Sequence, residues 1–143
     1  MTGPTHLLTS AFIYKYGGFK TPYLFLLAFL SHFLLDAIPH YELSIEWNLA
    51  LGACAGVFLL ERARTRGDYK IIIAAVLGGL PDGNWMLKVS PFLSGIHNFF
   101  HFKKIFPVPV FFLLFEAVFA FSCAYLIVCN RMGDSGYKKI LRK

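Results

Sequence analysis

Long apolar runs, broken by glycine, proline and short basic stretches, dominate this chain of 143 residues. Apolar runs of ten or more residues bounded by such residues are typical of buried helices, because strands are usually shorter. The pattern therefore predicts helical segments, which cover about residues 4–16, 22–38, 43–60, 69–81, 91–106 and 108–129.

Two of these segments differ from a simple membrane span. The fourth has a strictly apolar part that is too short to cross a bilayer alone, so it either continues past Asp82 or packs as a half-span. The fifth mixes aromatic residues with two histidines and two lysines, which is typical of a helix that lies at the membrane interface. In the third, Gly52 and Gly56 favour close helix packing.

The composition supports a membrane protein. Hydrophobic residues make up 57% of the chain and charged residues only 15%, whereas a soluble domain has about 25% charged residues. We therefore predict an all-α integral membrane protein, a compact bundle of about four to five membrane segments plus a short interfacial helix. Residues 1–143 would form this single helical domain, with a basic tail over about 131–143.

The net charge of +6 is explained by topology, because lysines and arginines fall in short stretches between apolar runs. We therefore expect no nucleic-acid partner, and we expect the protein to be surrounded mainly by membrane lipid. The positive-inside rule places most basic residues in the cytoplasm, which makes the protein a multi-pass protein of the cell membrane. The ends of the segments that carry histidine and aspartate would then face the extracytoplasmic side. The oligomeric state is left open.

Histidines and aspartates gather at the predicted segment ends, where this topology brings them to one rim. Such groups are costly to bury in an apolar chain, so a divalent metal site is the leading interpretation. The candidate ligands are His6, His32, Asp36, His40, Asp82, His97 and His101.

The spacing of these residues suits metal binding. Residues four apart share one helix face, so His32 with Asp36, and His97 with His101, can each hold one ion. Pro39 ends the second segment where His40 can turn back toward the same ion. Five imidazoles and two carboxylates exceed one tetrahedral zinc site, so either two ions are bound or some residues orient the ligands. Zinc is favoured, and manganese is the other candidate.

The same residues suggest hydrolysis by a metal-activated water. Asp36 and Asp82 are the candidate catalytic carboxylates. Asn98, Lys103 and Lys104 are the candidate contacts to an anionic, amphiphilic substrate. Plainer interpretations remain open, since histidines also sit at membrane interfaces and Pro-Asp-Gly-Asn is common in turns. Glu116 either pairs with a basic group, reaches the interface or joins the site.

Several functions are compatible with such a site. The first is a membrane hydrolase that acts on a phosphate or acyl ester of an amphiphilic lipid. The second is a divalent metal transporter or metal-handling protein, which would need polar residues along its path. A haem-binding anchor is disfavoured, because aspartates are hard oxygen ligands.

At these motifs the chain resembles the bacterial and archaeal membrane-bound metal-dependent hydrolases related to YdjM. The resemblance spans roughly residues 3 to 104 and rests mainly on His32-x-x-x-Asp36-x-x-Pro39-His40 and on Gly79-Leu80-Pro81-Asp82. It implies a small multi-span protein whose histidines and aspartates bind a divalent metal for hydrolysis. The chain is more faintly similar to the zinc-dependent phospholipase C and nuclease group. It departs from the hydrolase pattern at Asn84, Asn98 and Phe100.

Overall fold

The computed structural model describes residues 1–41, 43–100 and 110–129. These residues form an all-helical fold. Its helices are α1 (Gly3–Tyr16), α2 (Thr21–Asp36), α3 (Ile45–Arg66), α4 (Lys70–Leu87), α5 (Pro91–Phe100) and α6 (Phe111–Cys129).

Local sequence signals explain most helix ends. Prolines stand in the first turns of α1 and α2, where a missing N–H costs nothing. Gly67 has φ 64°, a left-handed conformation that glycine adopts without strain, and it ends α3. The predicted third segment stopped at Leu60, but α3 continues to Arg66 because its charged last turns are still good helix formers. The end of the fifth predicted segment, residues 101–106, lies outside the described residues.

The fourth helix continues past Asp82, which is one of the two alternatives that the sequence left open. Helix α4 runs through Pro81 and Asp82 to Leu87, so Pro81 does not break it. Pro81 has no N–H to donate to the preceding turn. This affects the carbonyl of Leu77, and the next carbonyl, that of Gly78, accepts a hydrogen bond from the His32 side chain. Asp82 is therefore held on a helix.

The predicted bundle of four to five membrane segments is wrong. Among the described residues, only α6 is both long and apolar enough to cross a membrane, judged by length and composition. The reason is partly length, because α1, α2 and α5 have 14, 16 and 10 residues against about 20 for a span. Charged or polar residues interrupt the longer α3 and α4.

This correction also affects the predicted location. One helix could cross a membrane, but the multi-pass arrangement is not supported. The extracytoplasmic placement of the metal site depended on spans that alternate across the bilayer. With one candidate span this alternation is lost, and the placement has no support.

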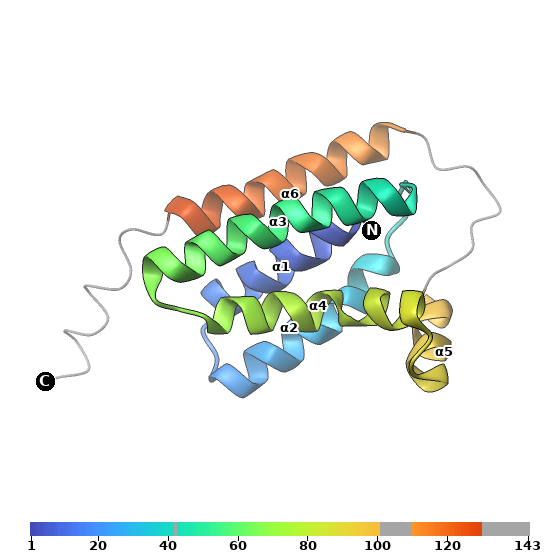
Figure 1. Cartoon of the computed structure of the whole chain (residues 1–143), viewed down its shortest axis with the longest axis horizontal. Coiled ribbons are helices and arrows are strands. Elements are labelled where there is room, and N and C mark those ends of the chain that lie inside the picture. Colours follow the sequence, from blue (N-terminus) through green and yellow to red (C-terminus); the bar gives the residue numbers. More distant parts are fainter. Residues whose placement is uncertain (42, 101–109, 130–143) are drawn as a thin grey trace, which may run out of the picture.

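Helix α1 lies at the centre of the molecule. Figure 1 shows it between α3 and α6 on one side and α2 and α4 on the other, and it contacts all four. Its buried residues are small or polar, which allows close packing, and they are Thr5, His6, Leu8, Thr9, Ser10 and Ala11. The apolar core continues from Leu8 and Ala11 into α3, α4 and α6. The central helix can thus carry polar groups into the interior.

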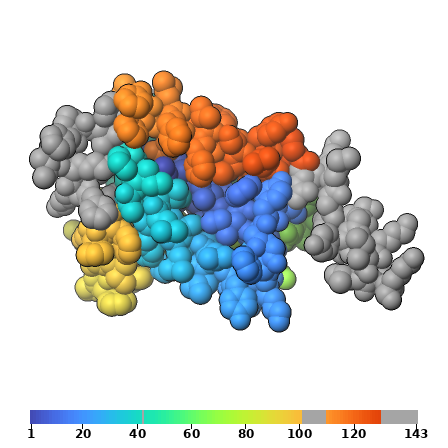
Figure 2. Space-filling model, turned by 180° about the vertical axis from the view of Figure 1, so that it is seen from behind, coloured from blue at the N-terminus to red at the C-terminus, as the bar shows by residue number. Residues whose placement is uncertain are grey.

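Large apolar side chains cover much of the outer surface. Helix α6 forms one long edge of the molecule (Figure 2), and its Leu114, Phe115, Val118 and Phe121 are exposed. Further exposed apolar residues lie on α2 and α4, such as Leu34 and Leu87. Exposed apolar surface of this extent marks contact with another protein or with lipid.

Candidate metal centre

Four helices bring histidines and aspartates together at one end of the bundle. His6 lies in the first turns of α1, and His32 and Asp36 lie in the last turns of α2. Asp82 comes from the second half of α4, and His97 comes from α5. The i, i+4 spacing places the His32 and Asp36 side chains on one face, as expected.

The Asp36 carboxylate is the centre of the cluster. Its Oδ1 lies 3.1 Å from His6 Nε2, and its Oδ2 lies 2.9 Å from His32 Nε2 and 3.0 Å from His97 Nε2. The Met1 nitrogen is 3.0 Å from Oδ1. The rings of His6 and His32 stack with centroids 4.0 Å apart. Three imidazoles thus direct the same nitrogen atom at one carboxylate.

Asp82 closes the cluster on its open side. Its carboxylate oxygens lie 3.4 Å from His97 Nε2, 3.6 Å from His32 Nε2 and 4.0 Å from His6 Nε2. The Asp82 side chain is 31% exposed, whereas that of Asp36 is fully buried. Solvent or a ligand therefore approaches the cluster past Asp82.

The hydrogen bond of His32 indicates a cation in this cluster. His32 Nδ1 lies 2.8 Å from the Gly78 carbonyl oxygen, which can only accept, so Nδ1 carries the hydrogen. In a neutral imidazole, Nε2 then has a lone pair, and this lone pair faces Asp36 Oδ2 at 2.9 Å. Two acceptors at this distance repel each other unless a proton or a metal ion lies between them. Metal-bound histidines commonly donate their other N–H to a backbone carbonyl in this way.

The donor atoms also lie close enough for one ion. One ligand atom from each of His6, His32, Asp36 and Asp82 lies within 4.8 Å of the others, so this group could hold a metal ion. Ligands of a tetrahedral zinc ion at about 2.1 Å would be roughly 3.4 Å apart, which is within the range of distances seen here. His97 Nε2 adds a fifth donor beside both carboxylates.

Burial and hydrogen bonding set the charges in the cluster. Burial lowers the pKa of His6 to about 4 despite the hydrogen bond with Asp36, so this imidazole is neutral at pH 7. Burial opposes the charge of Asp36, but the His32, His6 and His97 imidazoles beside its carboxylate outweigh this and lower the Asp36 pKa. A neutral imidazole and an ionised carboxylate are the forms that bind metal.

Two contacts that the sequence did not predict fix the helices around the cluster. At Gly78, an added Cβ would lie 1.8 Å from Ser10 Oγ, so only glycine allows α4 to approach α1 this closely. Asn84 accepts a hydrogen bond from Ser90 N–H at 2.8 Å and donates to Ser94 Oγ at 3.1 Å. It thereby joins the end of α4 to α5, which carries His97.

Glu116 supports the cluster from outside. This buried residue of α6 accepts a hydrogen bond from the Thr5 hydroxyl at 2.8 Å and another from the Thr2 N–H. Thr5 directly precedes His6, so Glu116 anchors the start of the helix that carries this histidine. The sequence left three roles open for Glu116. Among the described residues, Glu116 supports the site through Thr5 and contacts none of the candidate ligands directly.

Among the described residues, His40 and Asn98 are not in the group of potential metal ligands. The His40 ring does not turn back toward the ion, because its Nδ1 donates to the Ile38 carbonyl at 2.8 Å. Asn98 is exposed on α5 beside His97. His101, Lys103 and Lys104 lie outside the described residues.

Comparisons with protein-family models, with curated proteins and with solved structures found no match to this chain. The candidate metal centre therefore depends on the geometry of its own residues.

Proposed function

We propose that this protein is a metal-dependent hydrolase that acts on a phosphate or acyl ester of an amphiphilic lipid, as the resemblance to the hydrolases related to YdjM implies. The observation that carries the proposal is the arrangement of three imidazole Nε2 atoms around Asp36, with Asp82 at the open side. A donor set of imidazoles and carboxylates suits zinc best, with manganese as the alternative.

Different residues of the chain would bind the ion and accept the proton. His6, His32, His97 and the buried Asp36 would hold the ion. The chemistry that a divalent ion held there would supply is the activation of water as a nucleophile at neutral pH. Asp82 borders the solvent and would accept the proton of the attacking water. These four donors would suffice for one ion, which leaves Asp82 available for the proton.

The surface beside the cluster supports a lipid substrate. The side chains of Leu87, Val89, Phe92 and Phe99 are each more than 70% exposed and flank the ends of α4 and α5 that carry Asp82 and His97. An acyl chain would lie on this apolar surface while its polar head reaches Asp82. Helix α6 would keep the protein at the membrane where such substrates are found.

The test is metal analysis and turnover on the purified full chain in neutral detergent. We expect bound zinc or manganese, and hydrolysis of lipid phosphate or carboxyl esters that a chelator abolishes and added metal restores. Asp82→Asn should lose turnover while it keeps most of its metal. Glu61→Gln, which alters an exposed acid on α3, should change neither. Stoichiometric metal without turnover on any ester, together with ion accumulation in sealed vesicles, would replace hydrolysis with metal transport.

A further inference from the structure

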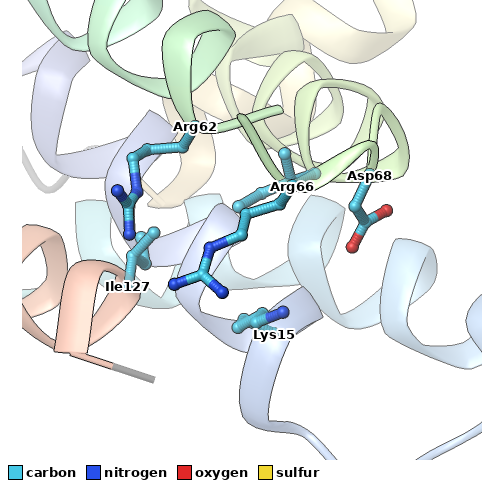
Figure 3. A pocket seen from close by; sticks show the side chains of 6 residues that line it. Lys15, Arg62, Arg66, Asp68 and Ile127 are labelled. Carbon is cyan, nitrogen blue, oxygen red and sulfur yellow. The ribbon is translucent and has the colours of Figure 1, made fainter. Parts of the chain in front are cut away.

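A second cluster of charged residues lies at the opposite end of the bundle, where α1, α3 and α6 end. Lys15, Arg62 and Arg66 line a small cavity of about 20 Å³. The other lining residues are Asp68, Ile71 and Ile127. Figure 3 shows the arginine side chains extending from α3 toward the end of α1, where Lys15 lies. Three cationic groups thus share one cavity with a single carboxylate.

The basic groups of this cavity have few partners. The Asp68 carboxylate accepts a hydrogen bond from the Tyr14 hydroxyl at 2.9 Å, and no salt bridge joins it to these cations among the described residues. The Nε of Arg62 is buried and has no hydrogen-bond partner within the described part of the chain. A buried donor without an acceptor is unfavourable, so a bound acceptor would stabilise this arrangement.

Helix capping explains only part of the arrangement. Basic side chains near helix C-termini offset the helix dipole, and Arg62 Nη2 does this for α6 by donating to the Val128 carbonyl at 3.0 Å. Lys15 and Arg66 lie in the last turns of α1 and α3, but among the described residues neither they nor Arg62 Nε donate a hydrogen bond to a helix-end carbonyl. They border a space of about 20 Å³, which holds one water-sized group such as a single phosphate oxygen, and guanidinium groups bind phosphate oxygens well.

We propose that this cavity binds a phosphate group, either the headgroup phosphate of an anionic lipid or free inorganic phosphate. The position favours the lipid, because the cavity lies where the apolar α6 ends and Ile127 of α6 lines it. If α6 crosses the hydrocarbon core, its end lies at the level of the headgroups. The site is separate from the metal centre and does not depend on hydrolysis.

The experiment compares two probes on the full chain in neutral detergent. Binding of dioleoylphosphatidylglycerol from mixed micelles is titrated by native mass spectrometry, with dioleoylglycerol as the reference that lacks phosphate and inorganic phosphate as the competitor. Arg66→Gln and Lys15→Gln remove cations that make no hydrogen bond within residues 1–41, 43–100 and 110–129. Each should weaken phosphatidylglycerol binding about tenfold, the loss expected for one charge-assisted hydrogen bond.

Arg64→Gln is the matched control, because Arg64 is exposed on the same helix and does not line the cavity. It should leave binding unchanged. Competition by inorganic phosphate would show that the phosphate group alone is recognised, whereas lipid binding without competition would identify the lipid headgroup as the ligand. The proposal is overturned if Arg64→Gln weakens binding as much as Arg66→Gln, or if dioleoylglycerol, which has no phosphate, binds equally well.

Discussion

Replacing Gly78 with alanine should separate α1 from α4 and disturb the metal centre. The new Cβ would lie 1.8 Å from Ser10 Oγ and 2.5 Å from Ser10 Cβ, whereas ordinary contacts begin at 3.4 Å. Rotation of the Ser10 hydroxyl cannot relieve the contact with Cβ, so the two helices must move apart by roughly 1 Å. His6 lies one turn before Ser10 and would move with it.

The size of the effect follows from two opposing contributions. Alanine in place of a helical glycine favours folding by up to about 1 kcal/mol. Overpacking a buried contact costs about 1–3 kcal/mol, and a contact this close belongs at the upper end. We therefore expect Gly78→Ala to lose about 2 kcal/mol of unfolding free energy, measured by thermal unfolding of the metal-free protein. Its metal affinity should fall at least about tenfold, because coordination tolerates displacements of only about 0.2 Å.

Two variants test this reasoning. Gly83→Ala lies in the same helix with no atom within 4 Å of the new Cβ, so it should be slightly stabilised. Adding Ser10→Gly to Gly78→Ala removes the clashing side-chain atoms. This double variant should therefore recover part of the lost unfolding free energy. If Gly78→Ala is as stable as Gly83→Ala and binds metal normally, the close approach of α1 and α4 described above is incorrect.

Further predictions concern the polar groups of the site. Asp36→Asn should lose most bound metal by elemental analysis while helical content in circular dichroism is retained, because Asn cannot supply the negative charge that faces three Nε2 atoms. The metal-free protein should be most stable above about pH 6.5 and lose roughly 3 kcal/mol between pH 6.5 and 4 in pH-dependent unfolding experiments, because His6 binds a proton in the unfolded chain and resists one when folded. The lowered pKa of Asp36 should extend this loss of stability below pH 4. Unchanged stability between pH 6.5 and pH 4 would contradict the burial of a neutral His6. Glu116→Leu should lower the unfolding free energy by about 2–4 kcal/mol, because it leaves the Thr2 N–H and Thr5 hydroxyl buried without an acceptor. Glu116→Gln keeps an acceptor and should cost less than about 1 kcal/mol. Equal losses for the two variants in thermal unfolding would mean that the charge matters more than the acceptor.

Much of the helical pattern could be predicted because prolines and glycines mark helix ends locally. The error lay in equating apolar runs with membrane spans. Hydropathy reports that a residue avoids water, and helices of 14 or 16 residues that pack around a central helix satisfy that need without crossing a bilayer. The charged last turns of α3 were also assigned to a loop, although charge alone does not stop a helix.

The core of the candidate site could be predicted because its spacing is local. His32 and Asp36 lie one helical turn apart, and this geometry holds in any helix. His40 was misplaced because the direction of the chain after Pro39 depends on the turn, which spacing does not specify. The roles of Asn84 and Glu116 depend on partners in other segments, and Glu116 meets Thr5 from 111 residues away. Such contacts leave no periodic signal.

The central position of α1 has a consequence for biosynthesis. This helix leaves the ribosome before every other helix described, yet its buried face carries Thr5, His6 and Ser10, whose partners come from α2, α4 and α6. A short helix with a polar inner face gains little by forming alone. Until the later helices are made, α1 remains partly unfolded and is exposed to aggregation and proteolysis. Folding of this protein is therefore governed by contacts between distant parts of the sequence, which predicts slow maturation for so small a helical chain.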